Sequence, residues 1–504
     1  MISIVYSTHK DNEYNKKFKE HLLKSVGLKN TQILEFQNND EFSLSEIYNK
    51  GISESIYNIV VCLHHDVKLE TDWGKKLVRE FDNNPDYGII GKAGSCYFPE
   101  SGVYWEKMQQ TMVGQVHHQP EGQNKWLNRY SAKLPFLIPV VTLDGLFISF
   151  DKTKIKHQFD ESYGKFHFYD HGFCVPNFLD RVKIGVTSSF EITHQSIGKP
   201  NEEFFKTKDL FIKKYKEKLP LEIKPQNLYV TNINEKPLKN EKVAIVILTK
   251  GKLDLLFDCI DSFKRHCNSE YYKIFIGDTG STDEEKRSIH KYILTHYDQD
   301  IHLNEYDSYN FAKVNNDIVK NYINNDFTYI LFCNNDIKIL NNVISGMLNI
   351  FKTEGNVGTV GCRLHFGDGT VQHDGVVGLQ KKDDKSIYVT HLGFKSYYGY
   401  TPYVKEVFGN TAALMMIRKN TFEKCGYFDE KYISCFEDVQ LNLTCLILGY
   451  KNFYDGRLVA YHYESQTRND DGENLKKQGF DYKENLLPFI NENMNKLQKH
   501  FTVI

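Results

Sequence analysis

The chain has 504 residues, enough for two or three domains with cores of their own, and its formal net charge is −2. Because 63 Lys and Arg residues are balanced by 65 Asp and Glu residues, the chain presents no broad positive field, which argues against nucleic acid as a partner. Its ten cysteines form no Cys-x-x-Cys pair and no apolar run approaches the roughly 20 residues of a membrane span, so we expect a cytoplasmic protein with reduced thiols and no transmembrane segment.

Each half of the chain opens with a run of apolar and β-branched residues, at 2–6 and at 243–248. A threonine follows each run, Thr8 in the first half and Thr249 in the second, and then a lysine-bearing loop. Short apolar strands followed by amphipathic stretches such as residues 255–266 are typical of alternating β and α elements. We therefore predict the α/β class, with a mostly parallel, Rossmann-like sheet whose ligands bind at the carboxyl ends of the strands.

The pattern predicts two tandem domains, a short linker and a C-terminal helix. Three prolines interrupt the linker, which shows no sustained periodicity. Apolar residues at helical spacing across 484–500 predict a closing helix that packs on the second domain. A basic amphipathic stretch at 206–218 is typical of a solvent-exposed helix face, and it also fits peripheral contact with an anionic membrane. The predicted boundaries are 1–215 for the first domain, 216–240 for the linker, 241–480 for the second domain and 481–504 for the helix.

Landmarks of the first half return in the second half in the same order. The same 24 positions separate Asp170 from His194 and Asp438 from His462, and Asp144 finds a counterpart in Asn410. A repeat of this kind indicates one domain type duplicated in tandem, so a site in one half predicts a version of it in the other. Two short segments repeat most clearly: CLHHDVKL at 62–69 returns as CNNDIKI at 333–339, and FDESY at 159–163 returns as FDEKY at 428–432.

A carboxylate stands at the end of the same strand in each half. An apolar strand ends at His64-His65-Asp66 in the first half and at Asn334-Asn335-Asp336 in the second. Hard cations such as Mg2+ and Mn2+ prefer carboxylate oxygens, although a strand-terminal Asp is also a common turn residue or helix cap. A histidine follows at a matching distance in both halves, His194 and His462, which favours a metal site over a pair of buried core histidines.

A second carboxylate precedes a predicted helix in each half. Asp170 and Asp438 each stand shortly after the Phe-Asp-Glu repeat, at the head of an amphipathic stretch. From position alone such a residue is a helix cap. It is also a candidate general base that the helix dipole keeps ionised.

The second half resembles family 2 of the inverting glycosyltransferases, which have the GT-A fold, across residues 241–470. Residues 1–215 look like a more divergent branch of the same superfamily. In the second half the matching motifs are 244–249, GDTGSTD at 277–283, Asn316, Asn334-Asn335-Asp336, GNTA at 409–412, Glu437-Asp438 and His462. In the first half they are 48–51, 64–66, 88–94, 143–145 and 166–170.

The resemblance implies a role for each of these residues. The catalytic bases would be Asp170 and Asp438. The ligands of Mn2+ or Mg2+ would be Asp66, His194, Asp336 and His462. The nucleotide sugar would be contacted by Thr8, Asn49, His65, Thr249, Asp278, Asp283, Asn316 and Asn335. The acceptor side would be formed by Asp144, Gly145, Asn410, Thr411 and Glu437.

These roles suit direct displacement at an anomeric carbon, which needs a base for the acceptor hydroxyl and a cation for the departing diphosphate. Two departures from the family pattern stand out. Many members have a second acidic residue two positions after the base, where this chain has Gly172 and Gln440. The first half also offers only residues 35–40 in place of the loop at 277–281.

We therefore expect a bifunctional, metal-dependent inverting glycosyltransferase. Its donors would be nucleotide sugars, UDP-sugars by default, and its acceptor a glycan or lipid-linked glycan of a bacterial surface polysaccharide, at the inner face of the membrane. One alternative keeps a single active C-terminal transferase and gives the first domain only acceptor binding. Another treats the chain as a glycan-binding scaffold. A glycoside hydrolase would need two carboxylates that flank one bond, and each half instead offers an acid, a base-like Asp and a histidine in a nucleotide-binding pattern.

Overall fold

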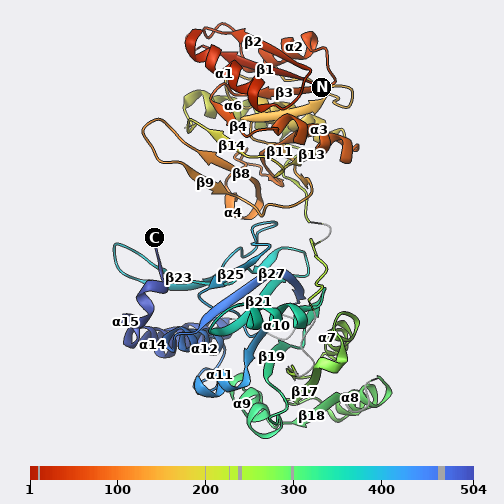
Figure 1. Ribbon diagram of the computed structural model, residues 1–504, viewed down its shortest axis with the longest axis vertical. Helices are drawn as coiled ribbons and strands as arrows, with labels where there is room; N and C mark the ends of the chain where they lie inside the picture. Colours follow the sequence, from red (N-terminus) through yellow and green to blue (C-terminus); the bar gives the residue numbers. More distant parts are fainter. Residues whose placement is uncertain (10–11, 199, 226–227, 236–240, 297–299, 464–471) are drawn as a thin grey trace. The chain divides into compact units, whose positions relative to one another are not determined.

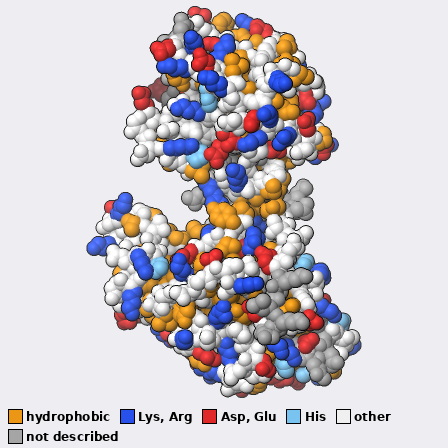
Figure 2. All heavy atoms as spheres, viewed as in Figure 1, with side chains coloured by type: hydrophobic (Ala, Val, Ile, Leu, Met, Phe, Trp, Pro, Cys, Tyr) orange, Lys and Arg blue, Asp and Glu red, His pale blue; other side chains and the backbone are white. Residues whose placement is uncertain are grey.

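The computed structural model describes residues 1–9, 12–198, 200–225, 228–235, 241–296, 300–463 and 472–504 (Figure 1). It divides into two compact units. Unit 1 comprises Met1–Lys224 with Tyr397–Gly399, and unit 2 comprises Pro225–Ser396 with Tyr400–Ile504. On the visible face of each unit, basic and acidic side chains are interspersed without a broad patch of one sign, as the balanced composition predicts (Figure 2).

Unit 1 alternates strands and helices through most of its length. Its strands are β1 (Ile2–Thr8), β2 (Thr31–Gln37), β3 (Ile59–Leu63), β4 (Val67–Leu69), β5 (Tyr87–Gly91), β6 (Ala93–Ser95), β7 (Tyr97–Phe98), β8 (Met112–His118), β9 (Trp126–Arg129), β10 (Ile138–Pro139), β11 (Thr142–Leu143), β12 (Phe147–Asp151), β13 (Lys183–Val186), β14 (Ile192–His194) and β15 (Leu221–Glu222). Its helices are α1 (Asn12–Ser25), α2 (Leu44–Glu54), α3 (Trp73–Asn83), α4 (Met108–Thr111), α5 (Tyr169–Leu179) and α6 (Glu202–Tyr215).

Unit 2 follows the same alternation. Its strands are β16 (Val243–Thr249), β17 (Tyr272–Asp278), β18 (Ile301–Glu305), β19 (Tyr329–Asn334), β20 (Ile337–Ile339), β21 (Val357–His365), β22 (Val371–His373), β23 (Val376–Gln380), β24 (Ile387–His391), β25 (Val404–Val407), β26 (Leu414–Arg418), β27 (Lys451–His462) and β28 (Thr502–Val503). Its α-helices are α7 (Leu253–His266), α8 (Asp283–His296), α9 (Phe311–Asn321), α10 (Val343–Thr353), α11 (Lys419–Lys424), α12 (Glu437–Ile447), α13 (Gly472–Phe480), α14 (Leu487–Glu492) and α15 (Met494–Leu497). Short 3-10 or π segments are Ser269–Tyr271, Asp481–Leu486 and Gln498–His500.

The central sheets of the two units have the same strand order. It runs β2-β1-β3-β12-β5-β13 in unit 1 and β17-β16-β19-β26-β21-β27 in unit 2. In each sheet the first three strands are parallel, and the fourth, β12 or β26, is antiparallel to both neighbours. The landmarks repeated in the sequence therefore occupy equivalent places in the two units.

The predicted α/β class is confirmed, but parallel pairings do not predominate in either central sheet: the large sheet of unit 2 has four parallel and five antiparallel pairings. In unit 1 the central sheet has antiparallel neighbours at β3–β12, β12–β5 and β10–β13, as many as it has parallel ones. The reason is geometric. Phe147, the first residue of β12, lies opposite Leu63, the last residue of β3, so the chain enters β12 at the carboxyl edge and must run back.

The hydrophobic cores lie on both faces of each sheet. In unit 2, α7, α8 and α10 cover one face, and α9, α11 and α12 cover the other. In unit 1, α1 and α3 pack on one face through residues such as Leu22 and Trp73. Alternate residues of these strands point to opposite faces, and both sets are apolar, which is typical of strands buried between two helical layers. The carboxyl edges of the sheets stay open, and the candidate functional site lies there.

Two predicted segments differ from the structure. The predicted linker 216–240 contains β15, which pairs antiparallel with β7 and so belongs to the fold of unit 1. Ile233, also in that range, packs against the core of unit 2. The predicted C-terminal helix is a series of short helical pieces that ends in β28, because β28 pairs with β23 and this pairing needs an extended chain. Apolar contacts still hold the segment, since Leu486, Ile490 and Leu497 are buried.

Candidate functional site

In unit 2 the strand-end carboxylate and the downstream histidine meet directly. Strand β20 pairs antiparallel with β27, so that Ile337, the neighbour of Asp336, lies opposite His462. Asp336 Oδ1 lies 3.2 Å from His462 Nε2, and both side chains are buried. The pairing of two strands that are distant in sequence therefore places a carboxylate against an imidazole at the carboxyl edge of the sheet.

The surroundings of this pair fit a divalent cation. His462 Nδ1 lies 2.7 Å from Gln372 Oε1, which can only accept, so Nδ1 carries a proton and Nε2 of the neutral ring has a lone pair. Among the described residues, none donates a hydrogen bond to the buried Asp336 Oδ1. Asn334 Nδ2 lies 3.2 Å from the same Nε2. The carboxylate oxygen of Asp336 and the imidazole nitrogen of His462, 3.2 Å apart, are a suitable donor set for Mn2+ or Mg2+.

Asp438 lies in the first turn of α12, as the sequence predicts. The N-cap residue Phe436 has a left-handed conformation, with φ of 76°, that turns the chain into the helix. Asp438 Oδ2 accepts a hydrogen bond from the main-chain N–H of Ala412 at 2.9 Å, and Oδ1 accepts one from Val439 at 2.7 Å. The first of these bonds ties the carboxylate to the turn before β26. Strand β26 pairs with β19, the strand that leads to Asp336.

A cavity of about 320 Å3 connects these groups. Its lining includes Asp336, His462 and Asp438, together with two of the predicted acceptor-side residues, Thr411 and Glu437. The predicted base and metal ligands of unit 2 therefore face one cavity, which is the arrangement that transfer between two bound substrates requires.

Two residues that the sequence did not single out support this cavity. Gln372 orients His462, as described above. Asp481 is fully buried and accepts hydrogen bonds from the main-chain N–H groups of Ile433, Ser434 and Cys435, at 3.1, 2.7 and 3.2 Å, so it holds the loop that lines the cavity. No sequence signal could have found them, because their partners are distant in the chain and an isolated Asp or Gln has no distinctive spacing.

The residues predicted to contact the nucleotide in unit 2 fall into two groups. Asp278 is buried at the end of β17, and its Oδ2 accepts no hydrogen bond from the described residues, so it keeps an acceptor for a ligand. Asp283 is exposed in the first turn of α8. By contrast, Asn335 Nδ2 donates to Thr249 Oγ1 at 3.1 Å, and both side chains are buried. Thr249 and Asn335 therefore hold two strand ends together, and their contacts with a nucleotide stay predictions.

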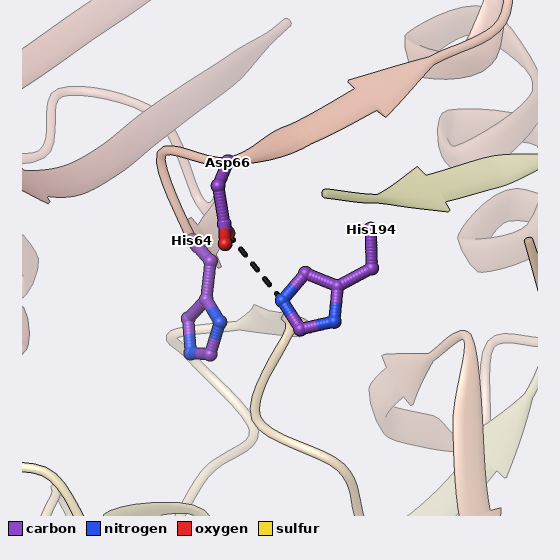
Figure 3. Close-up of side chains that lie close together, drawn as sticks. All are labelled: His64, Asp66 and His194. Carbon is purple, nitrogen blue, oxygen red and sulfur yellow. Dashed lines mark ion pairs between the residues drawn. The ribbon is translucent and has the colours of Figure 1, made fainter. Parts of the chain in front are cut away.

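Unit 1 repeats the strand-end pair in the same register. Val67, the neighbour of Asp66, lies opposite His194 in the pairing of β4 with β14. His194 Nε2 lies 3.4 Å from Asp66 Oδ1. Figure 3 shows His64 beside them, and the ligand atoms of the three side chains lie within 4.8 Å of one another. The cluster thus contains both predicted ligands and one further histidine.

The charges in this cluster depend on one another. Burial alone would raise the pKa of Asp66, but the hydrogen bond and charge of His194 outweigh it and hold that pKa below its usual range. Burial likewise lowers the pKa of His194, but Asp66 overcomes this effect and raises it. Burial lowers the pKa of His64, which favours the neutral imidazole that binds metals.

Asp170 occupies the first turn of α5 as Asp438 does in α12. Its Oδ2 accepts a hydrogen bond from the main-chain N–H of Gly145 at 3.0 Å, and its Oδ1 accepts one from His171 at 2.8 Å. Burial raises the pKa of Asp170; the charge of His171 lowers it in part, and that of Asp144 raises it further. A carboxylate with a raised pKa is a better proton acceptor near neutral pH, which suits the role of a base.

The register of the sheets corrects one correspondence between the halves. Phe147 of β12 lies opposite Leu63, and Leu414 of β26 lies opposite the equivalent residue Cys333. Three positions earlier in each strand segment, Asp144 therefore corresponds to Thr411 and not to Asn410. The hydrogen bonds agree, because Gly145 and Ala412, one position later, both donate to the helix-head carboxylate. The sequence comparison was one residue out of register, since the loops before these strands differ in length.

The side chain of Asn410 is bonded inside the unit, and its acceptor-side contact stays a prediction. Its side chain is fully buried, and Nδ2 donates to Thr359 Oγ1 at 3.0 Å and to the carbonyl oxygen of Phe453 at 2.9 Å. The side chain therefore joins β21 and β27 inside the unit. By contrast, Asp144 accepts a hydrogen bond from the Tyr104 hydroxyl at 3.0 Å, beside Gly145 and Asp170.

Asn49 and Asn316 both make structural hydrogen bonds, and their contacts with a nucleotide stay predictions. Asn49 Nδ2 donates to the carbonyl oxygen of Phe159 and Oδ1 accepts from its N–H, both at 2.9 Å. Asn316 makes the same two bonds with Phe428, at 2.9 and 3.0 Å. Each amide therefore ties α2 or α9 to the repeated Phe-Asp-Glu loop, which explains why the two segments repeat together.

The remaining predicted contacts of unit 1 lie at the end of β1 and β3. Thr8 is buried, and its Oγ1 donates to Asn15 Oδ1 at 2.5 Å; the contact of Thr8 with a nucleotide stays a prediction. The ring of His65 packs edge-on against that of His9, with centroids 4.9 Å apart. The main-chain oxygen of His65 accepts from the Tyr14 hydroxyl at 3.1 Å. The contact of His65 with a nucleotide stays a prediction.

The structure identifies the residue of unit 1 that corresponds to Asp278. Thr249 lies opposite Asp278 in the pairing of β16 with β17, and Thr8 lies opposite Gln37 in the pairing of β1 with β2. Gln37 is exposed and uncharged. Unit 1 then continues directly into α2, whereas unit 2 inserts α8 and β18 before α9. The two units therefore differ at this edge of the sheet, although their strand-end pairs and helix-head carboxylates agree.

Comparison with known proteins matches most of the first unit to a family model. Residues 4–215 match the model of a family described as "Glycosyltransferase like family". The matched range includes Asp66, Asp170 and His194. It covers nearly all of Met1–Lys224.

Two curated relatives share part of the chain. The O-antigen biosynthesis protein RfbC of Myxococcus xanthus is 27% identical over 232 residues, which is 46% of this chain and 18% of that protein. The uncharacterized protein y4gI of Sinorhizobium fredii (strain NBRC 101917 / NGR234) is 24% identical over 238 residues, which is 45% of this chain and 25% of that protein. The matches thus span a quarter or less of the length of either relative.

Among solved structures, a crystal structure of GalNAc-T7 with UDP, GalNAc and Mn2+ gives a TM-score of 0.39 at 10% identity. The similarity covers 53% of this chain and 57% of that one, and a score of this size does not establish a common fold. Within the described part of the chain, no helix combines the length and apolar character needed to cross a membrane.

Proposed function

We propose that both units of the chain transfer sugars from nucleotide-sugar donors to a glycan acceptor, and the match of residues 4–215 to the glycosyltransferase-like family supports this for unit 1. One observation carries the proposal to unit 2. In each unit a carboxylate lies within 3.4 Å of a histidine on the adjoining strand, and a second carboxylate at a helix head accepts a hydrogen bond from the turn before the antiparallel strand. The same four groups recur in the same places on the same strand order.

In unit 2, Asp438 would take the proton from the acceptor hydroxyl as that oxygen attacks the anomeric carbon. Asp336 and His462 would hold Mn2+ or Mg2+, with Gln372 fixing the tautomer of His462. A bound cation of this kind stabilises the negative charge that develops on the leaving nucleoside diphosphate. Attack from the side opposite the leaving group inverts the configuration at the anomeric carbon. Asp170, with Asp66 and His194, would take the same roles in unit 1.

The donor and acceptor follow from separate features. The unused Oδ2 of Asp278 can accept a hydrogen bond from the imide N–H of uracil, which supports a UDP-sugar as donor of unit 2. Gln37 at the equivalent place in unit 1 both donates and accepts, so we expect unit 1 to use a different donor. The relative named for O-antigen biosynthesis supports a surface polysaccharide, free or lipid-linked, as the acceptor.

Two alternative functions of the chain differ in the role that they give to the helix-head carboxylates. If it only binds acceptor, Asp170 has no chemical role, although its burial and raised pKa are then unexplained costs to the fold. If the whole chain is a glycan-binding scaffold, neither helix-head carboxylate has a chemical role. The cytoplasmic location and the membrane contact stay predictions.

The test is a nucleotide-release screen with Mn2+ over a panel of nucleotide sugars, because background hydrolysis of a donor reports binding and activation without a known acceptor. The full-length wild type is compared with Asp170→Asn and Asp438→Asn. Asp180→Asn, which changes an exposed carboxylate of unit 1, is the matched control. Loss of a general base lowers the rate by about 10²–10⁴-fold.

We expect each variant to lose release from a different donor and the control to lose neither. An effect of Asp438→Asn alone, repeated with acceptor present, would leave a single active transferase in unit 2. Absence of release from every donor in the wild type would count against the transferase itself.

A further inference from the structure

The two units differ at one residue beside the metal position. The register of the strands makes His64 in unit 1 equivalent to Asn334 in unit 2. Each stands two positions before the strand-end carboxylate, Asp66 or Asp336, and directly after the last residue that pairs with the antiparallel strand β12 or β26. An imidazole nitrogen is a strong ligand for first-row transition metals, whereas an amide oxygen is a weak one. The same site is therefore built with different donors in the two units.

His64 is arranged as a ligand. Its Nε2 lies 2.7 Å from the hydroxyl of Tyr169, which leaves Nδ1 for another partner. Figure 3 shows one ring nitrogen of His64 facing the space between Asp66 and His194. Ligand atoms about 2.1 Å from a Zn2+ ion lie about 3 to 4 Å from one another, and the three groups here lie within 4.8 Å, so small side-chain rotations would close the set.

Tyr169 is the outer partner of this histidine, and the chain makes room for it. A Cβ added to Gly145 would lie 1.9 Å from the Tyr169 hydroxyl, so only glycine leaves that hydroxyl its place. Unit 2 has Ala412 at the position of Gly145 and Glu437 at that of Tyr169. When Nε2–H of His64 donates to the phenol oxygen, Nδ1 carries the lone pair, which is how second-shell partners prepare metal-binding histidines.

We propose that His64, Asp66 and His194 bind a late first-row divalent cation of the Zn2+ type without any nucleotide, and bind it in preference to Mg2+. Two imidazoles and one carboxylate, with the remaining positions open, form a recognised donor set for such ions. Unit 2, with only Asp336 and His462 as strong ligands, completes its shell with diphosphate oxygens and so needs the donor. The inference extends the proposed metal role of Asp66 and His194, and the two units would then respond to different cations.

The test measures metal binding directly. Full-length protein freed of metal with a chelator is titrated with Zn2+ and with Mg2+ by calorimetry, without nucleotide, and Co2+ is added in parallel because its visible absorption reports the ligands around it. His64→Asn introduces the residue that unit 2 carries at this place. The matched control is His157→Asn, which removes an exposed histidine that is also 2.6 Å from a carboxylate.

We expect one Zn2+ site in the wild type that is retained in the control. Its affinity should fall at least about tenfold in His64→Asn, since loss of an outer-shell partner alone typically costs about 10–100-fold. The reverse change, Asn334→His, should add a second nucleotide-independent site, so the inference does not depend on the stability of one variant. Melting curves of each variant check the fold.

Three outcomes would overturn the inference: no Zn2+ binding to the wild type without nucleotide, equal affinity in wild type and His64→Asn, or equal affinity of the wild type for Zn2+ and Mg2+. None of these readings uses sugar transfer. Donor hydrolysis in the screen described above can therefore fail while the cation site persists, or succeed while the site is absent, which separates this inference from the proposed function.

Discussion

Asp481 and Ser434 are joined by a hydrogen bond of 2.7 Å in which a fully buried carboxylate accepts from a main-chain amide. The amides of Ile433 and Cys435 point at the same carboxylate. This group lies outside the proposed chemistry, yet it holds the loop that forms one wall of the cavity in unit 2.

Asp481→Asn should therefore loosen that wall. An asparagine has a single side-chain oxygen and presents N–H donors to amides that also donate, so at least one buried N–H loses its partner, at a cost of about 1–3 kcal/mol. Urea denaturation of the full-length chain should show a loss of this size, and KM for the acceptor of unit 2 should rise. Asp300→Asn, at an exposed carboxylate, should change neither quantity. Unaltered stability would show that the carboxylate is not needed for the loop.

Gln372→Leu should weaken the cation site of unit 2. The leucine cannot accept the hydrogen bond from His462 Nδ1, so the ring loses the contact that sets its tautomer and orientation. An outer-shell change of this kind typically costs about 10–100-fold in metal affinity. The measurement is the Mn2+ concentration needed for half-maximal donor hydrolysis in an Asp170→Asn background, which silences unit 1.

Gln440→Leu is the control for this prediction. Its side chain bonds Tyr432 and Asp429, away from the histidine, and should leave the Mn2+ requirement unchanged. An equal rise in both variants would point to general loosening of unit 2 instead of a role for Gln372.

The activity of unit 1 should depend on the protonation of Asp170. Burial raises its pKa above the ordinary value, and the negative charge of Asp144 adds to the rise. A base works in its ionised form, so the rate should fall as pH falls through this raised pKa. Asp144→Asn removes the added charge, which lowers the pKa and should move the acid limb of the profile to lower pH.

Both profiles are recorded in an Asp438→Asn background, where only unit 1 turns over. Asp180→Asn, an exposed carboxylate in the same unit, should leave the limb in place. If Asp144→Asn lowers the rate equally at every pH, Asp144 acts through contacts with the acceptor and not through its charge.

Local patterns in the sequence were sufficient for the architecture. The buried strands are short apolar runs and the helices have apolar residues at helical spacing, so the α/β class follows from hydrophobic periodicity. The pairs Asp66 with His194 and Asp336 with His462 were also predictable, because the same spacing recurs in both halves. The helix-head positions of Asp170 and Asp438 followed from the same repeat.

The polar positions whose side chains bond within the fold share one feature. Asn49, Asn316, Asn410, Thr8 and Thr249 are polar residues near strand or helix ends, which is also where binding residues occur. Whether such a side chain points inward or outward depends on strand register and on partners distant in the chain, and a slip of one residue reverses its face. The match of Asp144 with Asn410 failed by such a slip.

The sequence by itself determined the fold class, the repeat, and which carboxylates and histidines stand at the carboxyl edge of each sheet. Only the tertiary structure decided which polar groups face the cavity, that Gln372 and Asp481 support it, and that His64 joins Asp66 and His194. The physical reason is the sequence separation of the residues that interact. Apolar periodicity acts between neighbours in the chain, whereas a hydrogen bond or a ligand set is completed by residues that only the packed sheets bring together.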